Sequence, residues 1–374
     1  MNPNPRDAAV AALVALPHMT PPRLHRALRT WPDPIAAVAA LESGDAGAVL
    51  DAEPRLDPER RAAITRAWRG VDVATAGTTL ARHGTRVRTC LDPDWPIDDE
   101  APDLPAALLL EGARADAFDR PRVAIVGTRT ATPPGLADAR DLARALTEAG
   151  ITVVSGLAIG IDGAAHAGSI DVGGPTIGVV ATGLDVVYPR RHVALTAAVR
   201  THGLVVTEHP HGTGPRPERF PVRNRIIAAL ADVVVVVEAA ARGGALSTAA
   251  AALRLGRPVF AQPGSRRNPV AAGTNALIAD GALVLLDPTD VIVAVGMTAG
   301  ARRSPLASPP AAPADPTPIH PEARAVLRAL AGEPATGDEL AARTRLGAPA
   351  VARAVGALVS AGLATRSRGL VWPI

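Results

Sequence analysis

Four arginines are crowded into ten residues, 216–225, where the only acid is Glu218. The surrounding sequence, 216–231, reads RPERFPVRNRIIAALA, and its arginines are Arg216, Arg219, Arg223 and Arg225. Guanidinium groups at this spacing repel one another unless acids elsewhere in the fold, or an anionic ligand, neutralise them. The formal net charge of the whole chain is only +3. The cluster is therefore a local feature, and anion binding is the chemistry that it suggests.

Glycine-rich turns follow several apolar runs of the sequence. They read VGTRTATPPG (126–135), SGLAIGIDGAAH (155–166), ATGLDVVYP (181–189), EAAARGGALSTAAAA (238–252) and PGSRRNPVAAGTN (263–275). Each turn is placed to start a helix, where unpaired N–H groups and the helix dipole stabilise anions. Turns use glycine for geometry alone, but three of these also contain arginine, at Arg129, Arg242 and Arg266–Arg267. Together they predict a phosphate-binding face.

The arginine cluster is expected to begin a helix. Pro221 suits a first helical turn, which predicts that Arg223 and Arg225 lie in that turn. Cations there oppose the helix dipole unless an anion is present, and guanidinium groups match phosphate oxygens in geometry. We therefore favour phosphate contact. The alternative is a solvated basic face that pairs with Glu218 or Asp232.

An aromatic side chain and several histidines are further candidates. Tyr188, the only tyrosine, precedes Arg190 and Arg191. An exposed ring there would suit base stacking, and a buried ring would close the turn. His209 and His211 have no second group of ligands at zinc spacing, so we expect loop residues and predict no metal site.

The second glycine-rich turn carries two groups that catalysts often use. Ser155 lacks the G-x-S-x-G pattern of a hydrolase nucleophile. His166 is placed to pair with Asp162 at i, i+4, and a structural role for it is favoured. We predict no catalytic residues and no cofactor.

The elements that position these turns alternate between apolar runs and alanine-rich helices. The runs lie at 123–127, 151–156, 176–183, 204–208, 233–238, 258–264 and 282–286. Apolar strands without polar alternation, separated by helices, indicate a parallel sheet covered on both faces. The fold class is therefore α/β, with a doubly wound, Rossmann-like core over about 121–295. Ligands bind such sheets at the carboxyl ends of the strands.

Smaller regions flank this core. Short helices, broken by proline and glycine, are expected over 1–70, which reads as a SAM-like or helix-hairpin-helix-like domain. A connecting extension with one strand, AALLLEG, covers 71–120. The proline- and alanine-rich segment 296–318 is typical of a linker. Three helices and a β-ribbon over 319–374 indicate a winged-helix domain. Its third helix, 348–362, has Arg353 as its only charge, so protein contact and DNA contact both remain open for this domain.

Composition excludes several classes of protein. The chain has no lysine, so all 39 basic residues are arginine and no P-loop or Schiff-base lysine exists. No apolar run reaches the roughly 20 residues of a membrane helix, and no secretory pattern begins the sequence. The single cysteine fits a reducing compartment. We expect a cytoplasmic protein with no membrane contact.

The middle of the chain closely resembles the DNA-processing protein A family (DprA, also called Smf). The resemblance runs through VAIVGTRTATPPG, VVSGLAIGIDGAAHAGS, GVVATGLDVVYPRRH, RFPVRNRIIAALADVVVVVEAAARGGALSTAAAAL, GRPVFAQPG and GTNALIADGA, in order over some 170 residues. The terminal regions resemble the family's helical extension and its winged-helix domain less strongly. The chain departs from the family in its first turn, which has Thr128 where serine is common. It also departs in the ARGGALSTA turn and in its lack of lysine.

The resemblance implies a non-enzymatic protein that binds single-stranded DNA without sequence preference. It also implies a homodimer and a role in protecting incoming strands and loading the recombinase RecA onto them in natural transformation. The residues expected to bind nucleic acid are Gly127, Thr128, Arg129, Ser155, Gly156, Gly160, Arg190, Arg191, Arg216, Arg219, Arg223, Asn224, Arg225, Arg242, Gly243 and Gly244. Among the four clustered arginines, Arg223 and Arg225 are preferred.

A nucleotide-processing enzyme is the alternative. Phosphoribohydrolases of the lysine-decarboxylase-like Rossmann group resemble this chain through a Gly-Gly-x-Gly-Thr turn followed by a catalytic glutamate. Here the turn reads GGALSTAAAA, with alanine where the acid is expected, and Glu238 precedes it. The missing acid favours the DNA-binding interpretation.

Overall fold

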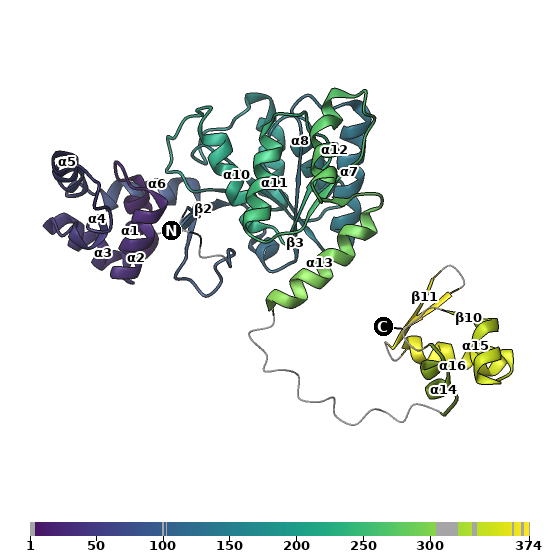
Figure 1. Cartoon of the computed structure of the whole chain (residues 1–374). Coiled ribbons are helices and arrows are strands. Elements are labelled where there is room, and N and C mark those ends of the chain that lie inside the picture. The colour runs from purple at the N-terminus through teal and green to yellow at the C-terminus, as the bar shows by residue number, and fades with distance from the viewer. Residues whose placement is uncertain are drawn as a thin grey trace. The chain divides into compact units, whose positions relative to one another are not determined.

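Figure 1 shows the computed structural model of the chain, which describes residues 4–98, 101, 103–303, 321–330, 335–360, 363–367 and 370–373. The chain divides into two compact units, Met1–Arg303 and Ser304–Ile374. Within the described ranges, the helices are too short or too polar to cross a bilayer.

Six helices form the N-terminal part of the first unit: α1 (Pro5–Ala15), α2 (Pro21–Thr30), α3 (Pro34–Ser43), α4 (Gly47–Leu50), α5 (Pro58–Trp68) and α6 (Val73–His83). Four of them have proline in the first turn, and side chains of Asn4, Asp33, Asp57 and Asp72 accept hydrogen bonds from N–H groups at helix starts. Their apolar faces surround the fully buried Trp68. Short helices are present over 1–70, as the sequence predicts, whereas α6 lies beyond that range, in the predicted connecting extension.

The core of the first unit is a nine-stranded sheet. Its strands are β1 (Arg86–Thr89), β2 (Ala107–Glu111), β3 (Arg122–Val126), β4 (Thr152–Ser155), β5 (Thr176–Val179), β6 (Leu204–Thr207), β7 (Val233–Val236), β8 (Val259–Ala261) and β9 (Leu283–Val284). They lie in the order β1-β2-β6-β5-β4-β3-β7-β8-β9. The expected Rossmann-like parallel sheet is present from β6 to β9. The connecting extension adds two strands that the core prediction did not include: β2 pairs antiparallel with β6, and β1 pairs antiparallel with β2.

Helices cover both faces of this sheet (Figure 1). One face carries α10 (Arg219–Leu230) and α11 (Gly244–Arg254), which pack on Ala124 and Val126 of β3. The other face carries α7 (Pro133–Glu148), α8 (Ile161–Asp171) and α13 (Pro288–Arg303), which pack on Val123 and Ile125. Successive residues of β3 therefore serve opposite layers, as the twofold period of a strand requires.

Short helices complete this unit: α9 (Val193–His202), α12 (Ala272–Ala279) and the 3₁₀ turns η1 (Ala115–Phe118), η2 (Arg190–His192) and η3 (Pro269–Ala271). The helix boundaries of α7 follow the sequence signals, because Thr132 caps its start and Gly150 follows its end at a φ of 81°.

The second unit has the three helices and β-ribbon of a winged helix: α14 (Pro321–Leu330), α15 (Gly337–Thr344), α16 (Ala348–Ser360), β10 (Ala335–Thr336), β11 (Ala364–Ser367) and β12 (Leu370–Pro373). A capping box begins α15, where Thr336 and Glu339 exchange hydrogen bonds. Helix α13 continues through the first residues of the expected linker, and the rest of it, 304–318, lies outside the described residues.

Candidate nucleic-acid interface

A cavity of about 470 Å³ opens where the order of the sheet reverses. The chain adds β4, β5 and β6 on one side of β3 and then returns to place β7 on the other side. The cavity lies at the carboxyl ends of β3 and β7, which is where open α/β sheets bind ligands. Half of the sequence-predicted residues line it: Gly127, Thr128, Arg129, Arg223, Asn224, Arg242, Gly243 and Gly244.

Helix α10 begins earlier than its proline suggests. Its first residue is Arg219, so Pro221 is the third, and Arg223 and Arg225 fall in the second turn. The prediction that these two arginines occupy the first turn is therefore wrong. Proline is tolerated at the third position because the first four N–H groups of a helix have no partner within it. The shift turns both guanidinium groups toward the interior, and each residue is at most 8% exposed.

Arg223 forms part of the cavity wall. Its Nη1 donates to the carbonyl of Val179, and the carboxylate of Asp162 lies beside it. Burial lowers the pKa of Arg223 to about 10, although the charge of Asp162 opposes that change. Burial also raises the pKa of Asp162, a change opposed by Arg223 and by the N–H of Gly156. The side chain of Arg223 still carries its charge at neutral pH.

Arg225 points to a different place from Arg223. Its Nη2 lies 2.6 Å from Oε2 of Glu208, in an ion pair whose side chains are about nine-tenths buried. With Arg219 it lines a separate cavity of about 330 Å³ against α1 and α2. Neither acid named in the alternative interpretation, Glu218 or Asp232, takes this role. Three of the four clustered arginines are therefore divided between two cavities, and Arg216 lines neither of them.

Ser155 and Gly156 lie behind the cavity wall. Ser155 is fully buried, and its hydroxyl donates to the carbonyl of Ile125 at 2.6 Å. Gly156 allows close packing, because an added Cβ would lie 2.3 Å from Nη1 of Arg223. Both residues hold the site together without lining the cavity.

The first glycine-rich turn is held against the start of α8. The N–H of Thr128 donates to the backbone carbonyl of Glu238 at 2.7 Å, and the carbonyl of Thr128 accepts from the N–H of Ile161 at 3.3 Å. Gly160 has a φ of 87°, and a Cβ there would lie 2.3 Å from the Thr128 carbonyl oxygen. Only glycine fits this position without moving the turn that carries Arg129.

We expect Gly160→Ala to destabilise the fold by about 2 kcal/mol, since a left-handed non-glycine residue costs about 1–3 kcal/mol. Urea unfolding measures this change. The control is Gly243→Ala, where a Cβ meets no atom within 4 Å. Equal stability of the Gly160→Ala variant and the wild type would contradict the assignment.

Several of the predicted arginines are accessible to solvent. Arg129 and Arg242 are exposed and line it. Three further predicted residues, Arg190, Arg191 and Arg216, are exposed but are not part of the lining. The pair Arg266–Arg267 is also exposed. Among the predicted arginines, the exposed ones that line the cavity are thus Arg129 and Arg242, rather than Arg223 and Arg225.

Two aromatic rings face the cavity beside Arg129. The guanidinium carbon of Arg129 lies 5.1 Å from the centre of the Phe220 ring, and the rings of Phe220 and Tyr188 are 5.4 Å apart. Tyr188 is 43% exposed, which confirms the exposed-ring interpretation over the buried one. Sequence reasoning missed Phe220, although a phenylalanine between arginines in a chain with 2% aromatics is itself a signal.

Two polar residues fix the turns around the cavity. Asn224 donates to the Gly244 carbonyl at 3.0 Å and to Ser247 Oγ at 2.8 Å, which joins α10 to the first turn of α11. Glu238 accepts from the N–H and the hydroxyl of Thr132, at 2.9 and 2.6 Å, at the start of α7. Neither role was foreseen, because each depends on contacts between segments distant in sequence.

His166 has a different partner from the one expected. Its Nδ1 lies 2.7 Å from the hydroxyl of Thr176, and the expected pairing with Asp162 is wrong. Burial, and then the charges of His192 and Arg223, lower the pKa of His166 to about 3. The ring is therefore neutral and links α8 to β5.

Comparisons with known proteins place this geometry in a family. The family model described as DNA recombination-mediator protein A matches residues 86–296, and that of the DprA winged helix domain matches 308–369. A protein of Mycobacterium tuberculosis is 41% identical over 230 residues, 58% of this chain and 59% of that relative. DNA processing protein DprA of Bacillus subtilis is 41% identical over 189 residues, 50% of this chain and 64% of that relative. The chain thus spans about three fifths of the length of these relatives.

Two solved structures are similar to this one. The structure of DNA processing protein A from Streptococcus pneumoniae has a TM-score of 0.66 and 30% identity, covering 78% of this chain and 98% of that chain. DNA processing protein A from Helicobacter pylori, whose structure is described as giving insight into its single-stranded DNA binding mode, has a TM-score of 0.50 and 28% identity. That match covers 57% of this chain and 96% of that chain.

Proposed function

Because this chain belongs to the DNA recombination-mediator protein A family, we propose that it binds single-stranded DNA at the cavity between the ends of β3 and β7. The observation that carries the proposal is the group formed by Arg129, Phe220 and Tyr188. A guanidinium group contacts phosphate, and exposed rings stack on bases of any sequence. Single strands offer free base faces to such rings, whereas duplex DNA does not.

The backbone turns supply the remaining part of the site. Gly243 caps the start of α11 and Gly244 is its first residue, and Arg242 is exposed beside them. Helix starts with free N–H groups favour phosphate oxygens. The strand would therefore run past Arg129 and Arg242, with its bases toward Phe220. Arg190, Arg191 and Arg216 lie exposed at positions from which they extend this basic surface.

The wider role follows from the family. We propose that the protein works in the cytoplasm, as a homodimer, that it protects incoming single strands, and that it loads the recombinase RecA onto them during natural transformation. Its chemistry is binding alone. The enzymatic alternative considers Glu238 because it precedes the glycine-rich turn. The carboxylate of Glu238 accepts hydrogen bonds from Thr132, which argues against a catalytic role for it.

We expect Arg129→Ala to weaken single-strand binding by about tenfold, because one guanidinium–phosphate contact and one support of the Phe220 ring are lost. Titration of a labelled oligothymidine at two salt concentrations measures this. The salt slope should fall by about 0.7, the value for one phosphate contact on a single strand.

The matched control is Arg254→Ala, which removes an exposed arginine from the last turn of α11, at the other end of that helix. Its affinity should equal that of the wild type. Two results would overturn the proposal: equal affinity of the wild type for single- and double-stranded DNA, or unchanged binding by the Arg129→Ala variant.

A further inference from the structure

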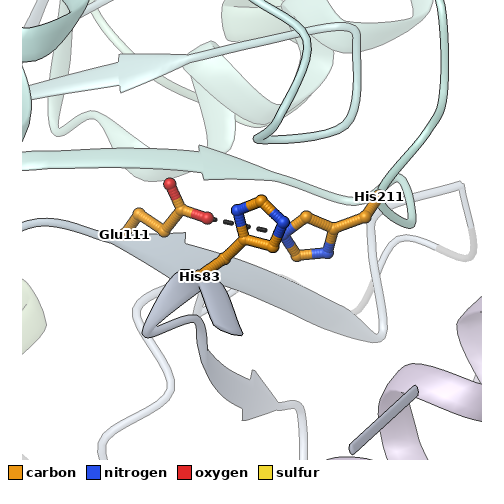
Figure 2. A group of neighbouring side chains, drawn as sticks. All are labelled: His83, Glu111 and His211. Carbon is orange, nitrogen blue, oxygen red and sulfur yellow. Dashed lines mark hydrogen bonds and ion pairs between the residues drawn. The ribbon is translucent and has the colours of Figure 1, made fainter. Parts of the chain in front are cut away.

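Two histidines and a glutamate meet at the antiparallel edge of the sheet, away from the cavity lining (Figure 2). His83 ends α6, Glu111 ends β2, and His211 lies in the loop after β6. One ligand atom of each residue lies within 4.8 Å of the others. The two imidazole rings are stacked, with centres 4.8 Å apart and an angle of 28° between their planes.

The carboxylate of Glu111 divides its two oxygens between different partners. Oε2 is paired with Nε of Arg200 at 3.0 Å. Oε1 accepts from the hydroxyl of Thr85 at 2.9 Å and lies 3.4 Å from Nε2 of His211. Glu111 is buried, whereas His83 is exposed. Oε1 therefore faces the histidines while Arg200 holds the other oxygen in place.

Thr85 and His211 are the hydrogen-bonding partners of the buried Glu111 oxygen, and His83 takes no part in these hydrogen bonds. The Thr85 hydroxyl lies 3.2 Å from Nε2 of His211, so Glu111, Thr85 and His211 form a chain of polar contacts. His83 lies on the solvent-exposed side of these polar contacts. Its imidazole nitrogen is the third ligand atom of the group, beside those of Glu111 and His211 (Figure 2).

We propose that His83, Glu111 and His211 bind a divalent transition-metal ion of the zinc class. Two imidazoles with one carboxylate form a typical zinc ligand set, and imidazole favours zinc, nickel, cobalt and copper over magnesium or calcium. The remaining position is available to the Thr85 hydroxyl or to water. Ligand atoms around zinc lie about 3.3 Å apart when its bonds are about 2.0–2.1 Å. The ligand atoms of the three residues now lie up to 4.8 Å apart. Rotation of the exposed His83 ring toward the other two residues would bring its nitrogen to the shorter distance.

The proposed ion would tie together three segments that already touch through the polar contacts of Glu111, Thr85 and His211. It connects the last helix of the N-terminal region to β2, the strand next to the sheet edge, and to the loop that leads from β6 to α10. Its role is structural, because no cavity for a substrate is lined by all three ligands in the described part of the chain. Arg200 already neutralises Glu111, so the site offers little net negative charge. We therefore expect micromolar rather than nanomolar affinity.

Calorimetric titration of the full chain, without a polyhistidine tag, with zinc chloride tests the proposal. We expect one site per chain, and the same site should take Co²⁺ with visible absorption bands of tetrahedral type. His83→Ala should lower zinc affinity at least tenfold. Because His83 is exposed at a helix end, this variant should fold and bind DNA as the wild type does.

The control variant is His202→Ala, which removes a histidine from the last turn of another helix, α9, outside the ligand set. It should bind zinc as the wild type does. His211→Ala, checked for folding by circular dichroism, should lose the cobalt bands. The proposal fails if the wild type shows no stoichiometric site, or if the His83→Ala and His202→Ala variants bind zinc equally.

Discussion

Replacing Phe220 by alanine is expected to weaken binding of single-stranded DNA by roughly tenfold to a hundredfold, corresponding to about 1–3 kcal/mol for one stacked base. Phe220 lines the cavity and contacts both Arg129 and Tyr188. Its removal takes away a stacking surface and also the ring face on which the Arg129 guanidinium rests. The effect should therefore exceed that of Arg129→Ala alone.

Conservative variants separate stacking from simple filling of space. Phe220→Tyr keeps a ring and should bind as the wild type does, whereas Phe220→Leu keeps an apolar side chain and should bind almost as weakly as Phe220→Ala. Fluorescence anisotropy with oligothymidine and with an abasic strand of equal length measures the difference. The variants should differ little on the abasic strand, which has no bases to stack. Wild-type affinity of the Phe220→Leu variant for oligothymidine would exclude stacking at this position.

Asp162→Asn is expected to cause the largest loss of stability, about 3–5 kcal/mol, because it leaves the charge of Arg223 buried without its neighbouring acid. Asp162 is 6% exposed and Arg223 is 4% exposed, so water does not replace the lost interaction. Asparagine keeps an oxygen that can still accept from the N–H of Gly156, which now lies 3.1 Å from Asp162 Oδ2. The loss therefore reports on charge rather than on this hydrogen bond.

The matched control is Asp171→Asn, which breaks the Arg140–Asp171 ion pair at the surface. Exposed pairs contribute about 0–1 kcal/mol, so this variant should unfold at nearly the wild-type urea concentration. The double variant Asp162→Asn, Arg223→Met should recover part of the lost stability, because it removes the uncompensated charge. If Asp162→Asn lowers the free energy of unfolding by less than Asp171→Asn does, then the charges of Asp162 and Arg223 are not coupled.

Most strands of the parallel sheet could be predicted from sequence because they are short apolar runs with both faces buried. VAIVG and VVVVVE, for example, give β3 and β7 within two residues of their observed bounds. The turns at their ends could also be predicted, since glycine marks them. The edge strand β1 could not, because its sequence RVRT has alternating arginines and lacks an apolar run.

The roles of individual arginines could not be predicted, because they depend on a helix phase and on partners far away in sequence. A start at Arg219 instead of Pro221 rotates Arg223 and Arg225 into the interior. The partner of Arg225 is Glu208, on another element, and only the folded chain brings the two together. The same reason hides the cluster of His83, Glu111 and His211, whose members have no motif spacing.

The central position of β3 has a consequence for the order of folding. Val123 pairs with Val153 on one side and with Val233 on the other, so its second neighbour lies 110 positions along the chain (233 − 123). Closing a loop of that length costs more entropy than closing the shorter loop to β4. During synthesis, β3 and β4 can pair long before β7 leaves the ribosome. The proposed DNA-binding cavity, which needs the ends of both β3 and β7, is therefore among the later features of the sheet to form.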